Sequence, residues 1–304
     1  MKRAYKILGN KVAESDDSDS NILVYISPDP EEKKFLIDTL KLDEHTLNSA
    51  LDPDEISRLE FEPDHIAIIM KRPKNYSSKF LLSFKVTSMG LFIFSDRIII
   101  ILPEDIPVFE GKSFDKSITL KDITLKLVQK PVVHFLEHLK TFSIILDELE
   151  SKINRTMQNK YLLNLFTLEK SLVYYLSAIN SNMLVIEKMK SNASKFVFNT
   201  DEQEFLDDIK IENSQCYKQA EIYSSILSSM MEARSSIVSN NINTLMKTLN
   251  IITIGIMLPS LVVGIFSMNV DFPLRGHPWA FWFILLFAAL SVATVIYFWK
   301  KLKW

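Results

Sequence analysis

Two long apolar segments near the C-terminus constrain this chain more than any other feature. The first runs from Ile251 to Met268 and the second from Trp279 to Trp299, and neither contains a charged residue. A helix needs about 20 predominantly apolar residues to cross the ~30 Å hydrocarbon core of a bilayer. The intervening residues, 269–278, are too few for an outer domain. We therefore predict two membrane-spanning helices joined as a tight hairpin.

Lysines gather at the ends of the hairpin that lie away from its loop. Lys247 precedes the first span and a Lys-Lys-Leu-Lys tail (300–303) follows the second, whereas the loop contains Arg275 alone. Because cytoplasmic flanks carry an excess of Lys and Arg, both termini are expected in the cytoplasm. The sequence thus predicts a multi-pass protein of the cell (inner or plasma) membrane, with the lipid bilayer as a partner.

The rest of the chain is large enough for a cytoplasmic core. The chain has 304 residues and a formal net charge of -2. Nucleic acid is not expected as a partner, because phosphate binding needs a concentrated basic face. The single cysteine, Cys216, excludes an internal disulfide.

Residues 1–115 are predicted to form a cytoplasmic α/β domain. Two short helical patterns, at 30–40 and 43–51, lie among runs that are rich in β-forming residues. These runs are Tyr5–Leu8, Ile22–Ile26, His65–Met70, Phe80–Val86, Leu91–Phe94 and Ile98–Leu102. The last two runs predict a hairpin whose strands are buried on both faces.

From about residue 116 the pattern becomes helical. Apolar positions recur every three or four residues over 116–200, which predicts long antiparallel helices with a break near Asn159. The next helix is expected to begin at Thr200-Asp-Glu-Gln, and no stop signal separates it from the first span. The predicted segments that follow are a stalk helix running into transmembrane helix 1 (201–268), an external loop (269–278), transmembrane helix 2 (279–299) and a basic cytoplasmic tail (300–304).

The cytoplasmic half of the stalk helix is unusually polar, with Ser and Asn recurring from Ser224 to Asn243. At 1.5 Å per residue the whole helix would be about 100 Å long, and such a helix is not stable alone in water. The simplest arrangement is a ring of identical helices around an axis, with the polar stripe facing a wet lumen.

The first span carries a recognisable set of residues. It contains Met257-Leu-Pro259 and Gly264 and ends with Phe-Ser-Met268-Asn269, and the lysine-rich tail follows the second span. The stretch 239–269 resembles the pore helix of the CorA metal-ion (magnesium/cobalt) transporter family, whose members end this helix in an aromatic-Gly-Met-Asn signature. The resemblance implies an α+β membrane protein that assembles as a homopentameric funnel, with the cytoplasmic domain, the long-helix stalk and the two spans described above.

The resemblance further implies a channel-like pathway for divalent cations, chiefly Mg²⁺, with Co²⁺ and Ni²⁺ as common alternatives. Residue spacing supports one common face, because positions that advance by threes and fours lie on a single stripe of a helix. The predicted pore-lining residues are Asn243, Met246, Leu249, Thr253, Met257, Ser260, Gly264, Ser267 and Asn269. This stripe holds no charge, and polar rings alternating with hydrophobic constrictions are typical of pores.

Asn269 is expected to meet the ion at the outer end of the pore. Mg²⁺ gives up its water reluctantly, so a ring of carboxamide oxygens suits a hydrated ion. Ser267 stands where the family's signature has glycine. A serine in the left-handed backbone conformation that glycine can adopt would cost on the order of 1 kcal/mol. Either the helix continues through Ser267 or the loop is held differently, and the preferred cation stays open. No cofactor is expected, since Mg²⁺ is the transported ion.

Family members also carry an inhibitory Mg²⁺ site between the cytosolic domains of neighbouring subunits. Matching back from the pore helix puts Asp208 on the stalk carboxylate of that site, with Asp207 beside it. The region that matches the partner acid, Lys71–Lys79, contains no Asp or Glu. A solvated helix face is an equally weighted interpretation of the two aspartates.

Three other functions fit parts of the sequence. One is a Zn²⁺ transporter of the same superfamily, where a proton gradient contributes. Another is a membrane-anchored cytosolic scaffold or sensor, which explains the spans but not Pro259 or the polar stripe. The last is a membrane zinc protease, because His134-Phe-Leu-Glu137-His138 matches an inverted zinc-binding pattern. No third ligand is evident, and we expect a divalent-cation transporter rather than an enzyme.

Overall fold

The computed structural model describes residues 1–9, 11–15, 20–74, 83–110, 114, 119–155, 159–268 and 276–302. The strands are β1 (Lys2–Leu8), β2 (Lys11–Glu14), β3 (Ile22–Ile26), β4 (Arg58–Phe61), β5 (Ile66–Pro73), β6 (Val86–Ile93) and β7 (Ile98–Leu102). The helices are α1 (Pro30–Asp38), α2 (Glu44–Ser49), α3 (Leu120–Arg155), α4 (Asn159–Ser191), α5 (Ala193–Phe196), α6 (Thr200–Phe266) and α7 (Ala280–Leu302).

The chain forms two compact units, Met1–Met230 and Met231–Trp304, and α6 contributes to both. The boundaries predicted at 115 and 200 lie within the first unit and remain predictions.

The first unit is built on one seven-stranded sheet with the order β2-β1-β3-β7-β6-β5-β4. Only β3 and β7 pair in parallel, and the other neighbours are antiparallel. All five residues of β7 are buried, because its side chains alternate between two cores. The predicted hairpin is confirmed in β6 and β7, which pair antiparallel, and every residue of the two strands except Val86 and Ile93 is buried.

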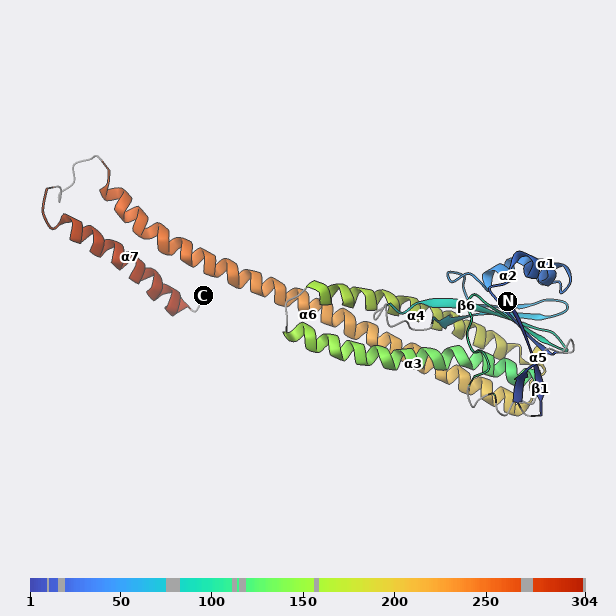
Figure 1. Ribbon diagram of the computed structural model, residues 1–304. Helices are drawn as coiled ribbons and strands as arrows, with labels where there is room; N and C mark the ends of the chain where they lie inside the picture. Colours follow the sequence, from blue (N-terminus) through green and yellow to red (C-terminus); the bar gives the residue numbers. More distant parts are fainter. Residues whose placement is uncertain are drawn as a thin grey trace. The chain divides into compact units, whose positions relative to one another are not determined.

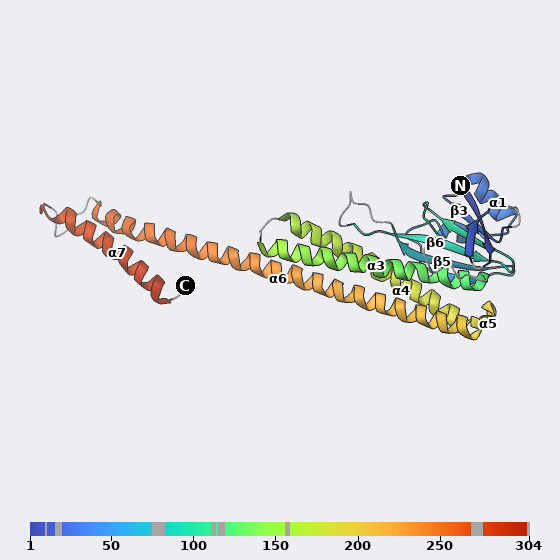
Figure 2. The same cartoon turned by 60° about the horizontal axis from the view of Figure 1, so that its bottom comes forward.

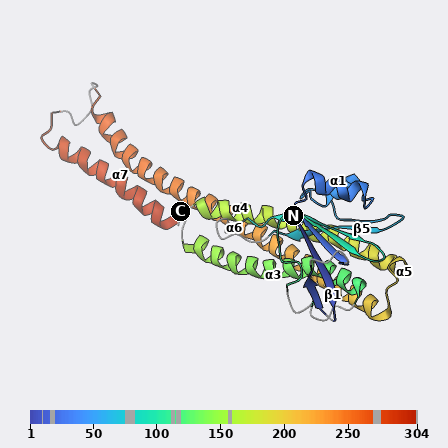
Figure 3. The same ribbon diagram turned by 45° about the vertical axis from the view of Figure 1, so that its right-hand side comes forward.

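Helices cover both faces of this sheet. The shorter helices α1 and α2 pack over the core that contains Tyr25, Phe92 and Ile99. On the other face, α3 and α4 pack over the core that contains Val24, Leu91 and Ile100, and the first part of α6 adds Leu206 and Ile209 to this core. Figures 1 and 2 both show α3, α4 and α6 side by side, and Figure 3 shows α1 on the side of the sheet away from α3.

A buried side chain locks α4 to the sheet. Asn182 is fully buried, and its Oδ1 accepts from the backbone N–H of Lys71 at 2.8 Å. Its Nδ2 donates to the Lys71 carbonyl at 2.7 Å. Strand β4 pairs with β5 only as far as Ile69. Beyond that residue, the side-chain amide of Asn182 makes the two hydrogen bonds to the β5 backbone that a neighbouring strand would make.

Two local predictions are corrected by the structure. Phe80–Val86 and Leu91–Phe94 were expected as separate strands, but Val86–Ile93 forms the single strand β6, while residues 80–82 lie outside the described part of the chain. Gly90 lies within this strand because a Cβ there would stand 2.5 Å from the Cβ of Ala50. The cap of α6 is Asn199, whose Oδ1 accepts from the N–H of Glu202 at 2.8 Å, one residue before the expected start.

The second unit has no core of its own in the described residues. The apolar parts of α6 and of α7 are each long and hydrophobic enough to cross a membrane, and neither is buried inside the protein. Exposed apolar side chains of this kind are covered by lipid in membrane proteins or by further protein.

Candidate ion pathway along helix α6

The predicted pore-lining residues share one exposed side of α6. We call them the exposed stripe, and its described members are Asn243, Met246, Leu249, Thr253, Met257, Ser260, Gly264 and Ser267. All eight are exposed, and among residues 235–268 only Lys247 is charged. Asn269, the predicted outer ring, lies outside the described residues.

A second stripe lies on the opposite side of the same helix. Between residues 248 and 268, every residue of α6 is exposed except Ile251, Gly255, Pro259, Val262 and Phe266. We call these five partly shielded positions the shielded stripe. Each residue turns an α-helix by 100°, so the centre of the shielded stripe lies about 160° around the helix axis from the centre of the exposed stripe. One side of the span is thus less exposed than the other.

The hydroxyl groups of the exposed stripe use their protons within the helix. Thr253 Oγ1 donates to the Leu249 carbonyl at 2.9 Å, and Ser260 Oγ donates to the Ile256 carbonyl at 2.8 Å. A hydroxyl has one proton and two lone pairs, so both side chains offer only acceptors outward. A hydrated cation presents water hydrogens to its surroundings, and acceptors are therefore the groups that suit it.

Ser267 is accommodated without a left-handed conformation. Helix α6 ends at Phe266, and the N–H of Ser267 still donates to the Val263 carbonyl at 3.0 Å. Its Oγ donates to the Gly264 carbonyl at 2.8 Å, and its φ is not positive. Of the two arrangements considered from the sequence, the structure has the helical hydrogen-bonding pattern continuing through Ser267, so the expected strain does not arise.

The two predicted regulatory aspartates differ in their surroundings. Asp207 forms an ion pair with Lys190 of α4, whereas Asp208 is exposed. A second ion pair of 3.0 Å, between Lys210 and Glu187, joins the same two helices. Within the described ranges no three His, Cys, Asp or Glu side chains are grouped to hold a metal. The metal role of Asp207 and Asp208 stays a prediction.

The His134–His138 pair is occupied by other contacts. The Nδ1 of His138 lies 2.7 Å from the Tyr175 hydroxyl, and the two histidine rings pack edge to face at 4.4 Å. Burial lowers the pKa of each histidine to about 4, so both are neutral at pH 7. Glu137 is exposed. These contacts account for the His134, Glu137 and His138 pattern without zinc.

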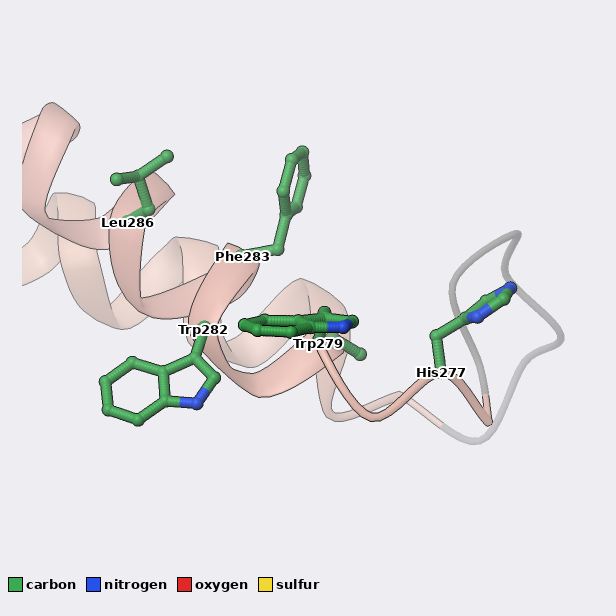
Figure 4. A pocket seen from close by; sticks show the side chains of 6 residues that line it. His277, Trp279, Trp282, Phe283 and Leu286 are labelled. Carbon is green, nitrogen blue, oxygen red and sulfur yellow. The ribbon is translucent and has the colours of Figure 1, made fainter.

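Aromatic side chains surround the first turn of α7. His277, Trp279, Trp282, Phe283 and Leu286 line an open pocket of about 510 Å³ (Figure 4). The indoles of Trp279 and Trp282 are 75% and 62% exposed. Tryptophan prefers the interface between lipid and water, and the pocket marks the position expected for that interface.

The exposed stripe agrees with the residues predicted from the sequence, whereas the shielded stripe was not predicted. Gly255 and Pro259 stand four residues apart, so both lie on one side of the helix. That spacing was the available signal for the less exposed side.

The chain resembles known proteins along most of its length. A family model described as CorA-like Mg2+ transporter protein matches residues 17–301. The cobalt/magnesium transport protein CorA of Methanocaldococcus jannaschii is 24% identical over 290 residues, which cover 91% of this chain and 89% of that protein.

Two solved structures share the fold. The complete structure of the CorA magnesium transporter from M. jannaschii superposes with a TM-score of 0.82 at 20% identity, covering 99% of this chain and 98% of the other. The full-length CmaX protein superposes with a TM-score of 0.74 at 16% identity, covering 99% and 97%. The predicted fold class, with an N-terminal α/β domain, long helices and two C-terminal apolar helices, is confirmed. Because the family match covers most of its length, the chain is a member of the CorA-like Mg²⁺ transporter family.

Proposed function

We propose that this chain moves divalent metal cations across a cell membrane through a homopentameric pore lined by the exposed stripe of α6. Mg²⁺ is the proposed principal ion, with Co²⁺ and Ni²⁺ as further cargo, and no cofactor takes part. Support comes from the family match and from the name of the relative, a cobalt/magnesium transport protein. Both termini are proposed to lie in the cytoplasm, where Lys300 and Lys301 follow the second span.

The observation that carries the proposal is the contrast between the two sides of the α6 span. The exposed stripe is uncharged and mixes acceptor groups with Met and Leu, while the opposite side is partly shielded. A helix facing lipid alone has no need of Ser260 or Thr253 on its free side. Around an axis, these residues form polar rings between hydrophobic constrictions. The membrane potential then drives a doubly charged ion inward with about 4.6 kcal/mol per 100 mV.

The test is ion uptake by the full-length protein in liposomes with an inside-negative potential. We expect saturable Mg²⁺ uptake that Ser260→Phe abolishes, because five phenyl rings fill the axis. Ile265→Phe is the matched control, since Ile265 lies off the stripe and is exposed. Equal uptake by both variants would reject the assigned stripe. Absence of any cation uptake by the native protein would favour the scaffold or sensor alternative.

The same assay separates the ions and tests the outer ring. Mg²⁺, Co²⁺, Ni²⁺ and Zn²⁺ are compared, and strongest uptake of Zn²⁺, increased by a proton gradient, would favour the zinc-transporter alternative. Asn269→Ala is expected to weaken capture of all the ions, and Ser267→Gly tests whether serine alters selectivity. Native mass spectrometry of the detergent-solubilised complex checks for five copies. A protease role requires zinc that His134→Ala removes, and the family match is to transporters.

A further inference from the structure

Pro259 leaves one backbone group of the α6 span without its usual partner. Proline has no N–H, so it cannot donate to the carbonyl four residues earlier, which belongs to Gly255. Both residues belong to the shielded stripe, and a Cβ built on Gly255 would meet nothing within 4 Å among the described atoms. The hydrocarbon interior of a membrane contains little water, and a Ser or Thr side chain of a neighbouring helix is one of the donors that satisfy such a carbonyl.

Helix α7 carries a shielded side that matches the one on α6. Its partly shielded residues are Ala280, Ile284, Ala288, Ser291, Val292 and Val295. When Phe266 is set opposite Ala280 in an antiparallel pair, Val262 falls opposite Ile284 and Ile251 falls opposite Val295. The two stripes therefore match at four of the five shielded positions of α6, and the fifth, Pro259, falls opposite Phe287, one residue from the shielded Ala288. Two helices that pack along these stripes shield both of them.

In this register, Ser291 stands opposite Gly255. Each residue lies eleven positions from the loop end of its stripe, which is about 17 Å along a helix. The Gly255 carbonyl points toward the C-terminus of α6, and the Ser291 side chain leans toward the N-terminus of α7. Because the hairpin is antiparallel, both directions lead toward the connecting loop, and donor and acceptor approach each other.

Ser291 is free to make this bond at little cost. Its Oγ now donates to the Ala288 carbonyl at 2.7 Å, on its own helix. That carbonyl is also the regular helical acceptor for the N–H of Val292, so it stays bonded when the hydroxyl turns away. Thr294, the hydroxyl residue nearest to it on α7, is exposed and lies off the shielded stripe.

We propose that the Ser291 hydroxyl donates a hydrogen bond to the Gly255 carbonyl that Pro259 leaves unpaired, within one chain. This bond holds α7 against the back of α6 at the level of the proline and keeps the exposed stripe clear of α7. Ser291 is a positioning residue, because it contacts no ion. The proposal needs both helices to lie in lipid and does not depend on which ion crosses.

A double-mutant cycle on the full-length protein tests the bond. All four tryptophans lie in residues 279–304, so tryptophan fluorescence follows α7 during thermal unfolding in lipid nanodiscs. We expect Ser291→Ala to lower the midpoint by about 2–4 °C in the native background. In the Pro259→Ala background, where alanine restores the N–H, Ser291→Ala should have no effect. Thr294→Val is the matched control and should leave the midpoint unchanged.

Infrared spectra of protein labelled with ¹³C-carbonyl glycine give a direct readout of the acceptor. The chain has six glycines, and the band lost in Gly255→Ala identifies the carbonyl of interest. Ser291→Ala should move this band to higher wavenumber only when Pro259 is present. A persistent Ser291→Ala effect in the Pro259→Ala background, or an equal effect of Thr294→Val, would overturn the proposal.

Disulfide trapping tests the register even if the proline variant does not fold. In a Cys216→Ala background, Gly255→Cys with Ser291→Cys should oxidise within one chain, because the proposed hydrogen bond brings these two positions close enough for a disulfide. Met257→Cys with Ser291→Cys places one thiol on the exposed stripe and should not react. Equal oxidation of both pairs, or bonds that join two chains, would contradict the proposed contact.

Discussion

The two units of the chain treat the same residue types in opposite ways. In the first unit, Met89 is 4% exposed within the core, and the buried amide of Asn182 is hydrogen bonded through both its oxygen and its nitrogen. In the second unit, Met257 is 63% exposed and Asn243 lies on the surface of α6. One chain therefore completes the first unit, whereas the second depends on its surroundings. Under the proposed function those surroundings are lipid, further copies of the chain and hydrated ions.

The largest expected difference between the units concerns methionine. Met89→Ala should lower the free energy of unfolding by about 2–5 kcal/mol, because the truncation leaves a cavity in a closed core. Met257→Ala should change stability by less than about 0.5 kcal/mol, because no packed neighbours are lost within the chain. Hydrogen exchange of strand β5 measures the first unit and tryptophan fluorescence measures the second. Similar losses at both positions would show that the two units do not differ in this way.

A somewhat smaller effect is expected for asparagine. Asn182→Leu leaves the N–H and carbonyl of Lys71 buried and unpaired, at a cost of about 1–3 kcal/mol for each group. We expect faster hydrogen exchange in β5, equivalent to a loss of about 2–4 kcal/mol. Asn243→Leu, the matched control, should leave exchange in β5 unchanged and slow cation uptake instead. Unchanged protection of β5 in Asn182→Leu would mean that water replaces the amide.

The comparisons of the two methionines and the two asparagines show what sequence patterns can and cannot predict. The long helices and the β6–β7 hairpin were predictable, because their apolar periods persist over many residues. The short edge strands β2 and β4 carry weak patterns and were missed. The bond between Asn182 and Lys71 joins residues 111 positions apart, and no local spacing reveals it. The exposed stripe was predicted from the resemblance to the CorA pore helix and from residue spacing, but the shielded stripe was not predicted.

The buried histidines of the first unit predict that its stability depends on pH. Burial lowers the folded pKa of His138 from about 6.5 to about 4. Between these values the unfolded chain binds the proton first, so stability is complete above about pH 6.5 and declines as the pH falls toward 4. The contribution is on the order of 3 kcal/mol, and His134 adds to it.

Unfolding in urea between pH 4 and 7 measures this effect. The variant His138→Gln keeps a polar group near Tyr175 but removes the titration, so the decline toward pH 4 should become shallower. His45→Gln is the matched control, since His45 is exposed. A decline that is as steep in His138→Gln as in the native protein would assign the pH dependence to other groups.

The smallest effect is expected where α4 and α6 meet at the surface. The side chains of Lys190 and Asp207 are 51% and 45% exposed, and exposed ion pairs contribute about 0.2–1 kcal/mol. Asp207→Asn should therefore lower the free energy of unfolding by less than about 1 kcal/mol and leave uptake unchanged. Asp208→Asn should instead raise the internal Mg²⁺ concentration that is needed to slow uptake, because the exposed carboxylate of Asp208 is the one available to bind an ion. If both variants shift this concentration equally, the ion pair does not distinguish the two carboxylates. Both Asp207 and Asp208 would then take part in regulation by internal Mg²⁺.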